Sequence, residues 1–510
     1  MSEIGAQATT LDRPTRIACT DVNSADLRAH CQSALAAGAR MQMAYAWFPD
    51  ESSHPEVRYL LHWGGERPLH LWRCRPAGSA LPSLAPISPL LSWYEREITD
   101  LCGVAFSDQP QPEPLVLLPG AHTARPALLP GLPEPVGYTP AMPSRLPQMS
   151  GPASEDVQRL PFGPIRADVL ESAQFDFYYL GEAILHYQPQ LFFKHRAMEK
   201  RFEAVTPSLG VVLAERVSAV GGVAHALAYC QAIEAAALCE VPLRAAWLRS
   251  LLAELERLYN HMHYLGHLCH TTTLKVGEAQ GKYLEELAKQ MNARATGSRL
   301  LRSLLVPGGL RRELRLEGLL EALEEIERQY VPYAALLEAS TSHLDRLNTT
   351  GELSPQLAFD QGATGPIERA SGLDRDLRRD YPYAAYRELP FEVALKDGCD
   401  AHAREQVRMA EILQSIELIR RILRGLPPGP VRASCEPRGG AEGIGWVESP
   451  RGSLYYAVHL DRAGQLARVK IKSPSFSNWR VFPFTVHDSN MMDYAINEAS
   501  FGLTVAGCAR

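Results

Sequence analysis

Prolines divide this chain more firmly than any other feature of the sequence. Between Pro110 and Pro152, a stretch of 43 residues contains twelve prolines and several glycines. Proline lacks a backbone N–H and fixes φ, so neither a helix nor an interior strand runs through such a density. Residues 110–155 are therefore expected to be a free linker or an extended strap, and the composition fits both. The chain is predicted to fold as two units on either side, residues 1–109 and 156–510.

The length and charge of the chain agree with this division. At 510 residues it exceeds the roughly 250 to 300 residues of a single core. A net charge of −6 without any Lys/Arg block argues against nucleic-acid binding and against a polybasic membrane anchor. The sequence lacks an 18-residue apolar run and a signal-peptide pattern, so a cytoplasmic protein is expected. The ten cysteines never form C-x-x-C, which indicates reduced thiols and disfavours an iron–sulfur cluster in this chain.

The first unit is predicted to be a small α/β domain. Its pattern indicates a helix over 25–37 and strands over 41–47, 57–62 and 69–73. A second helix is expected within 88–106. Its charged residues fit either a solvent-exposed face or a docking surface.

The second unit is predicted to be mainly helical. Apolar residues recur at helical spacing over 246–270, which indicates a core helix. Further helices are expected over 224–238, 316–347 and 402–423, and the alternation within 441–480 predicts a β-hairpin. The fold class is therefore α+β: a small α/β N-terminal domain, a proline-rich strap, and a large mainly helical domain with peripheral β-hairpins.

Two patterns resemble common ligand motifs without completing them. The helix over 246–270 carries four histidines, three of them on one face at zinc-binding spacing: His263, His267 and His270. No carboxylate or thiol obviously completes a site, so core or interface histidines are favoured over a metal site. The glycines of 439–445 precede a hairpin rather than a helix, which disfavours a dinucleotide-binding loop.

Two charged clusters are better candidates for function. His195, Arg196 and Glu199 are interleaved with apolar residues, which fits either proton transfer by partly buried groups or a surface ion-pair network. Arg369 and Asp376 belong to a short loop dense in Arg, Asp and Gly, which favours a functional or interface loop over a plain connection.

Nine motifs, taken in order, resemble the large subunit of group 4 membrane-bound nickel–iron hydrogenases. In that group a domain similar to the complex I 30 kDa subunit precedes a catalytic-type domain similar to the complex I 49 kDa quinone-site subunit. The motifs here are LLSWYEREITDLCGVAF, GPIRADVLES, FFKHRAMEK, ERVSAVGGVAH, LAELERLYNHMHYLGHL, ATGSRLLRSLLVPGGL, GPIERASGLDRDLRRDYPYAAYRELPFEV, GCDAHAREQVRMAEILQSIELI and ESPRGSLYY.

The departures from this family concern its metal and quinone ligands. In the hydrogenases two Cys-x-x-Cys pairs supply four thiolates to nickel and iron. The matching positions here are Ser218, Gly221, Thr504 and Gly507, and Cys508 stands one residue away. Hydrogen activation at a nickel–iron centre is therefore not expected. The quinone-contacting His and Tyr of the complex I relative are also replaced, by Arg166 and Ala219.

The resemblance implies a degenerate pocket around these positions. It implies no metal and no other cofactor bound by this chain itself, an iron–sulfur cluster in a partner small subunit, and quinone as a candidate ligand. The candidate proton carriers are Glu171, His195 and His225, and the candidate electrostatic groups are Arg216, Arg369 and Asp376. The degenerate pocket positions are Ser218, Ala219, Gly221, Thr504 and Gly507.

The function that follows is electron transfer within a complex I-like or hydrogenase-4-like membrane complex. The chain would take part in electron transfer to a quinone or an unidentified acceptor, coupled to ion translocation. It would sit on the cytoplasmic face of a bacterial inner membrane, docked on an iron–sulfur small subunit and on membrane subunits resembling the complex I arm. The competing hypotheses are a structural or regulatory scaffold and an active hydrogenase that uses other ligands.

Overall fold

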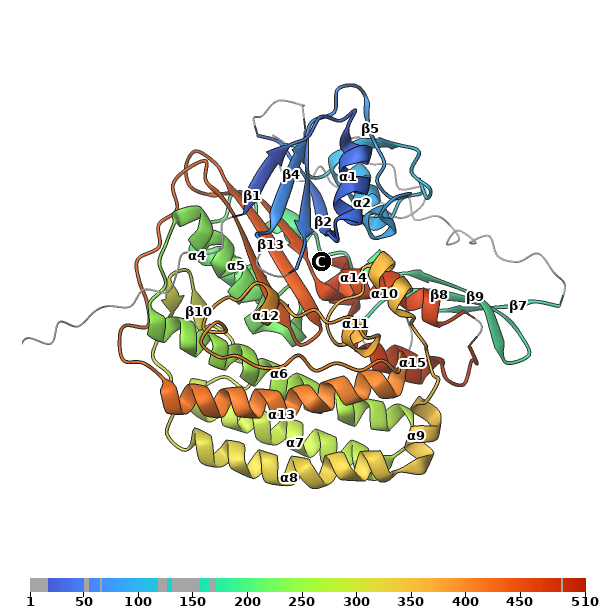
Figure 1. The fold of residues 1–510 in the computed structure, drawn as a ribbon, viewed down its shortest axis with the longest axis vertical. Helices are drawn as coiled ribbons and strands as arrows, with labels where there is room; N and C mark the ends of the chain where they lie inside the picture. The colour runs from blue at the N-terminus through green and yellow to red at the C-terminus, as the bar shows by residue number, and fades with distance from the viewer. Residues whose placement is uncertain are drawn as a thin grey trace, which may run out of the picture.

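Two sheets and a layer of long helices organise the chain in the computed structural model (Figure 1). The structure describes residues 17–49, 55–64, 67–117, 126–130, 156–165, 171–487 and 489–510. Most of the predicted strap lies outside the described residues, as does Arg166.

The N-terminal unit is a four-stranded sheet with two helices. The strand order is β1 (Ala18–Asp21), β4 (His70–Cys74), β3 (Glu56–His62), β2 (Arg40–Trp47). The β1–β4 pair is parallel and the other two pairs are antiparallel. The helices are α1 (Leu27–Ala36) and α2 (Ser92–Cys102), and α2 packs against β2. These elements confirm the helices and strands predicted for this part of the sequence, and a short parallel pair, β5 (Ala80–Pro82) and β6 (Ala105–Ser107), adds to them.

Four long helices pack in a ring at the opposite end of the molecule (Figure 1). Around the ring, α6 (Leu243–Thr271) contacts α7 (Lys275–Thr296), α7 contacts α8 (Leu319–Ala339), and α13 (Ala401–Gly425) contacts both α8 and α6. The single helix predicted over 316–347 was wrong, because the helix ends at Ala339 and a second one, α9, runs Thr341–Leu347. Ser340 breaks it: its hydroxyl donates to the Leu336 carbonyl at 2.6 Å, in competition with the backbone ladder.

The C-terminal sheet lies between the N-terminal unit and the helical ring. Its order is β12 (Glu442–Ser449), β13 (Gly452–Leu460), β14 (Leu466–Lys472), so the predicted hairpin is confirmed and gains a third strand. Every residue of β13 is buried, so this sheet is interior rather than peripheral. Its charged residues are buried as well, because Glu448, Arg468 and Lys470 all form ion pairs.

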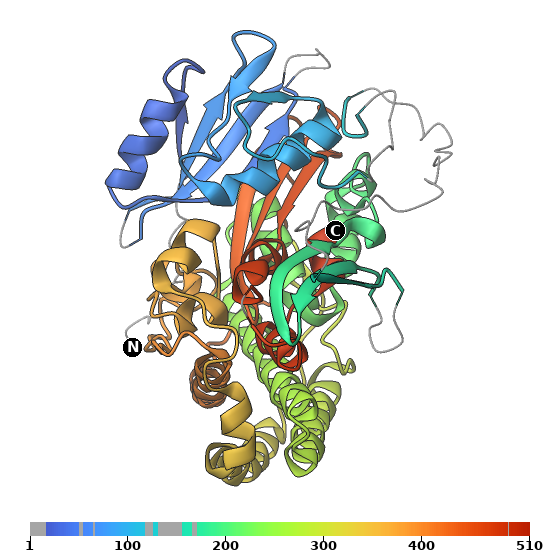
Figure 2. The ribbon, with the colours of Figure 1, turned by 90° about the vertical axis from the view of Figure 1, so that its right-hand side faces the viewer.

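Helix α5 (Gly222–Ala237) covers the C-terminal sheet by packing on β12. The glycines of 439–445 serve this contact, because an added Cβ on Gly443 would lie 2.1 Å from the Ala232 carbonyl oxygen. At the side of the molecule, β7 (Gln158–Phe162), β8 (Gln174–Leu180) and β9 (Ala183–Gln190) form a separate sheet, which Figure 2 shows beside the C-terminal helices.

Within the described residues no single helix combines the length and apolarity needed to cross a membrane. One pair of helices has the length and apolarity jointly, α4 (Pro207–Ala214) with the segment Ala219–Ala237, but the pair is bent by 115°.

Candidate functional site

The two loops at the degenerate ligand positions meet at the starts of two helices. Ser218 precedes the 3-10 turn Ala219–Gly221 and then α5, and Thr504 precedes α16 (Val505–Ala509). Ser218, Gly221 and Gly507 line one small cavity together with His225, and Thr504 lies beside it, 3.2 Å from the Ser475 hydroxyl of the cavity wall. The volume of this cavity in which the centre of a water molecule fits is about 20 Å³, enough for one or two water molecules.

A carboxylate holds each loop by accepting backbone N–H groups from the first turn of the helix that follows. Glu256 accepts from two N–H groups of α5, at 2.7 and 2.9 Å, and Glu171 accepts from two N–H groups of α16, at 2.5 and 3.0 Å. The helix dipole and the otherwise unpaired N–H groups both stabilise a negative charge there. Burial nevertheless raises the pKa of Glu256 to about 7, and its two backbone hydrogen bonds only partly oppose this.

Arg196 ties the two loops to each other. Its guanidinium donates to the carbonyls of Arg216 and Val217, at 2.9 and 2.5 Å, just before the first loop. It also donates to the Ala506 carbonyl in the second loop, at 3.1 Å. One side chain therefore fixes the distance between two segments that lie almost 300 residues apart in the sequence.

The two candidate histidines are neutral rings in fixed positions. His195 Nδ1 lies 2.5 Å from the Ala509 carbonyl oxygen. A carbonyl only accepts, so Nδ1 carries the proton and Nε2 is left as the basic nitrogen. His225 lines the cavity, and its Nδ1 lies 2.8 Å from the Tyr456 hydroxyl. Burial lowers the pKa of both rings, that of His225 to about 3.

The cation at the cavity is Arg451 rather than Arg216. Arg216 is exposed, and its guanidinium donates back to the Val212 carbonyl of α4 at 2.7 Å. Arg451, in the turn between β12 and β13, lines the cavity and donates to Asn260 at 2.9 Å. Burial lowers its pKa to about 10. The motif ESPRGSLYY contains Arg451, but nothing in the sequence shows that this turn reaches the two loops.

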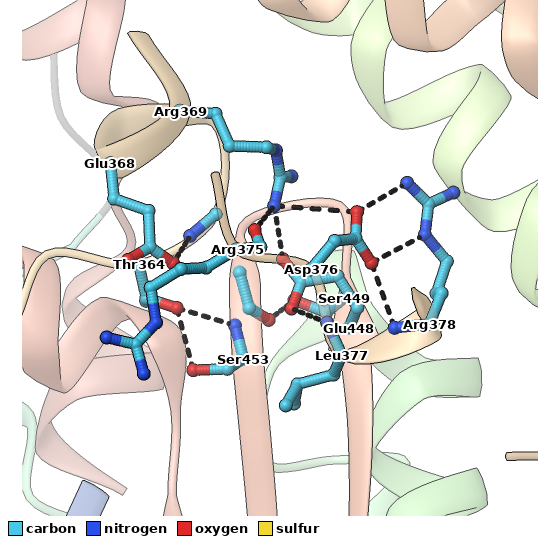
Figure 3. A network of polar contacts seen from close by, with 12 residues as sticks. Thr364, Glu368, Arg369, Arg375, Asp376, Leu377, Arg378, Glu448, Ser449 and Ser453 are labelled. Carbon is cyan, nitrogen blue, oxygen red and sulfur yellow. Dashed lines mark hydrogen bonds and ion pairs between the residues drawn. The ribbon is translucent and has the colours of Figure 1, made fainter. Parts of the chain in front are cut away.

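Arg369 and Asp376 lie in a separate buried ion network (Figure 3). Arg369 pairs with Glu411 at 2.7 Å and with Glu448 at 3.0 Å, and Asp376 pairs with Arg378 at 2.8 Å. Arg257, Glu254 and His261 of α6 extend the network. Neither Arg369 nor Asp376 lines the cavity at the two loops.

Three guanidiniums in this network face four carboxylates. Burial alone would raise the pKa of Glu411, but Arg369 and its neighbours overcome this and hold the pKa well below its usual range. Burial raises the pKa of Glu448 to about 7, because Arg369 compensates it only in part and Asp376 opposes ionisation. Glu448 is therefore the carboxyl group of this network that changes its charge near neutral pH.

A second buried network joins the N-terminal unit to the site. Glu97 of α2 pairs with Lys470 of β14 at 2.5 Å and with Arg510. Glu199 pairs with Arg468 at 2.8 Å and with Lys470 at 3.2 Å. The acidic side of α2 is thus a docking surface within the chain, and Glu199 belongs to a buried ion network rather than a surface one.

The histidine face of α6 points to solvent. His263, His267 and His270 are exposed, and successive ring centroids lie 6.2 and 6.4 Å apart. The Nδ1 atoms of His263 and His270 lie 3.0 Å from carboxylate oxygens of Glu285 and Glu278 of α7. In the part of the chain that the structure describes, no group of three or more His, Cys, Asp or Glu side chains is arranged to hold a metal ion.

The side chains at the ligand positions do not fit a nickel–iron centre. Ser218 and Thr504 offer hydroxyl oxygens, which are hard ligands, and Gly221 and Gly507 offer none. Thr504 Oγ1 already accepts from Gly507 N at 3.2 Å. Cys508 is buried and is not among the cavity residues, and burial raises the pKa of its thiol, which disfavours the thiolate that a metal needs.

Comparisons with known proteins match both parts of the chain to respiratory subunits. Residues 284–439 and 436–510 match the model of the respiratory-chain NADH dehydrogenase 49 Kd subunit, and residues 21–128 match that of the 30 Kd subunit. Formate hydrogenlyase subunit 5 of Escherichia coli (strain K12) is 30% identical over 81% of this chain and 74% of its own length. An NADH-quinone oxidoreductase subunit of Geotalea uraniireducens (strain Rf4) is 31% identical over 58% of this chain and 84% of its own length.

A solved structure shows the same fold. A chain of the membrane-bound sulfane sulfur reductase, an archaeal respiratory membrane complex, superposes with a TM-score of 0.66 at 24% identity, over 71% of this chain and 100% of that one. The chain belongs to the family of complex I 49 kDa-type subunits and their membrane-bound hydrogenase relatives, with a 30 kDa-type domain fused ahead of the 49 kDa-type domain.

Proposed function

We propose that this chain is the large peripheral-arm subunit of a membrane-bound oxidoreductase of the complex I and hydrogenase-4 type. It docks on an iron–sulfur small subunit and on membrane subunits, on the cytoplasmic face of a bacterial inner membrane. Residues 1–109 form its 30 kDa-type domain, 110–155 the strap and 156–510 the 49 kDa-type domain. Relatives that are themselves named as parts of formate hydrogenlyase, hydrogenase-4 and NADH-quinone oxidoreductase support this assignment.

One observation supports the proposed chemistry: the hydrogen bonds that hold the two loops together are formed, although the metal-ligand positions carry no thiolate. Glu171, Glu256 and Arg196 hold the two loops together, whereas Ser218 and Gly221 leave a space in place of thiolates. The space inside this chain fits only water, so an acceptor as large as a quinone ring binds in the space shared with the small subunit.

The residues around this space supply protons and charge. A quinone reduced to a quinol takes up two electrons and two protons. The electrons come from the small subunit's cluster, and the protons pass along the cavity wall, where His225 and the Tyr456 hydroxyl are hydrogen-bonded. Because His225 stays neutral, it transfers a proton by accepting one at one nitrogen while releasing one at the other. Arg451 stabilises the negative charge that develops before protonation.

Replacing His225 tests this role. In the assembled complex, His225→Phe is expected to lower acceptor-dependent electron flow about 100-fold, because positioned acid–base groups contribute about 10²- to 10⁴-fold. Tyr456→Phe, which removes only the hydroxyl partner, is expected to cause a smaller loss and to shift the pH profile. The measurement is steady-state electron flow across a pH series, with the stoichiometry of the complex checked by native electrophoresis.

The matched control is His270→Phe, on the exposed face of α6. It is expected to leave both assembly and electron flow unchanged. Normal electron flow in a fully assembled His225→Phe complex would instead establish the chain as a structural scaffold. The small size of the cavity is the observation that favours this second function.

Metal analysis provides an independent test. The purified complex is expected to contain far less than one nickel atom per chain, because the four ligand positions offer no thiolate. Elemental analysis by mass spectrometry measures nickel and iron in the same sample. Stoichiometric nickel would contradict the proposal, whereas iron accounted for by the small subunit's cysteines is compatible with it.

A further inference from the structure

A second cavity lies between the N-terminal sheet and the C-terminal sheet. Arg40 and His62 of the N-terminal sheet line one side, and Ser453 and Lys472 of the C-terminal sheet line the other. The volume of this cavity in which the centre of a water molecule fits is about 30 Å³, enough for about two water molecules. This cavity is distinct from the one at the two loops, and the proposed function does not use it.

In the part of the chain that the structure describes, three cations on its wall have no carboxylate partner. Lys472 Nζ donates only to the carbonyl and hydroxyl of Ser453, both at 2.7 Å. Arg480 donates to the carbonyls of Pro89 and Gln361, at 2.5 and 2.6 Å.

The third cation, Arg375, donates to His62 at 2.7 Å. Across the described residues, no Asp or Glu oxygen lies within 4 Å of the charged nitrogens of Arg375, Lys472 or Arg480, whereas the neighbouring Arg40 pairs with Glu368 at 2.8 Å.

His62 adds an unused hydrogen-bond donor. Arginine can only donate, so His62 Nδ1 accepts from Arg375, and the ring proton of the neutral imidazole sits on Nε2. This Nε2 is buried and has no hydrogen-bond partner among the described residues, and the whole residue is only 3% exposed. A buried donor without a partner costs the full desolvation of that group.

Two of these three cations are buried, which makes their lack of a carboxylate partner more costly. Lys472 and Arg480 are 2% and 8% exposed, and burial lowers the pKa of Lys472 to about 7 and that of Arg480 to about 9. Glu368 and Glu448 oppose this effect on Lys472 only in part. A buried cation without a paired carboxylate is expensive, so it either loses its proton or is stabilised by an anion in the cavity. The acidic residues that line the cavity pair with other arginines: Glu368 with Arg40, Glu448 with Arg369, Asp376 with Arg378 and Asp380 with Arg379.

We propose that this cavity binds a small, singly charged anion, of the size of chloride, formate or acetate, between Lys472, Arg375 and His62 Nε2. The cavity volume sets the size limit, and the half-exposed lining residues Gln361 and Arg375 mark its opening. The anion joins the N-terminal sheet to the C-terminal sheet, so its presence stabilises the contact between the two units.

Thermal unfolding of the full-length chain at constant ionic strength tests this. Replacing gluconate by acetate or chloride is expected to raise the unfolding midpoint in a saturable way, by about 2 °C at a hundredfold excess over Kd. Sulfate, which is larger and doubly charged, is expected to have no such effect. Titration calorimetry with acetate measures the stoichiometry, expected to be one per chain.

Two variants identify the site. Lys472→Met is expected to weaken acetate binding about 10- to 100-fold, because a hydrogen bond to a charged group is lost. It is also expected to leave the midpoint in gluconate unchanged or higher, since it removes a buried unpaired charge. Arg375→Gln, at a half-exposed position, provides a second variant if Lys472→Met fails to fold, and it is expected to weaken binding as well.

The control is Arg299→Gln, an exposed arginine that pairs with Glu286, neither of which lines the cavity. It is expected to keep the acetate response of the unmodified chain. A response that follows ionic strength alone, or one that Lys472→Met and Arg375→Gln leave intact, would overturn the assignment.

Discussion

Replacing Arg369 by methionine is expected to destabilise the folded protein by about 3 to 5 kcal/mol, the cost of removing one partner from a buried ion pair. Arg369 has no exposed side-chain surface and bonds both Glu411 and Glu448. Methionine fills much of the volume but removes the guanidinium that the two carboxylates share, which leaves Glu411 with only His261 and the longer pair to Arg257, at 3.4 Å. Glu448 can take up a proton near neutral pH, but Glu411 remains a buried charge. Denaturant unfolding of the purified chain measures the change.

Two companions to this variant separate charge from geometry. Arg369→Lys keeps the charge but cannot bond two carboxylates in one plane, so an intermediate loss is expected. Arg346→Met removes an arginine from a solvent-accessible pair with Asp493, and a loss below about 1 kcal/mol is expected. If Arg369→Met were as mild as Arg346→Met, the buried network would not stabilise the fold.

The sequence marked the loop of Arg369 as unusual but could not identify its partners. A dense group of Arg, Asp and Gly predicted a functional or interface loop. In the structure Arg369 of this loop bonds carboxylates of other elements of the chain. Its partners come from α13 and β12, 42 and 79 residues further along the chain. Only the tertiary fold brings Glu411 and Glu448 to it, and no local pattern encodes that meeting.

Periodicity predicted most of the helices because burial follows it. The helix α6 has apolar residues on its core faces throughout, and its predicted limits lie within three residues of the observed ones. The helix α7 was missed although its buried positions recur at helical spacing, because most of them are small or polar residues and only Leu284 and Met291 are large and apolar. The break at Ser340 depends on one side-chain hydrogen bond, which propensity does not reveal.

The candidate site was only partly readable from sequence. Resemblance to the hydrogenases indicated the two loops, and the structure places Ser218, Gly221 and Gly507 around one cavity. Arg216 was an expected electrostatic group because it adjoins the first loop, yet it faces solvent. Glu256 was missed because it reads as an ordinary member of an amphipathic helix, and its bonds to α5 exist only after packing.

Substituting Gly445 by alanine is expected to destabilise the fold by about 3 kcal/mol or more, at the upper end of the cost of overpacking. A Cβ on Gly445 would lie 2.1 Å from the Ala228 carbonyl oxygen and 2.6 Å from Ala232 N, and these backbone atoms of α5 cannot rotate away. Helix α5 would have to move off β12. Because α5 begins at the cavity and carries His225, the same change is expected to lower electron flow in the complex.

Gly78→Ala is the matched control for this substitution. An added Cβ there meets no atom within 4 Å, so a change below about 0.5 kcal/mol is expected. Thermal unfolding of the two variants in parallel decides the question. Equal midpoints would mean that α5 does not rest on bare strand backbone at Gly445. A large difference would show that the glycine-rich stretch 439–445 is needed for helix–sheet packing, which positions one wall of the candidate site without any glycine contacting a ligand.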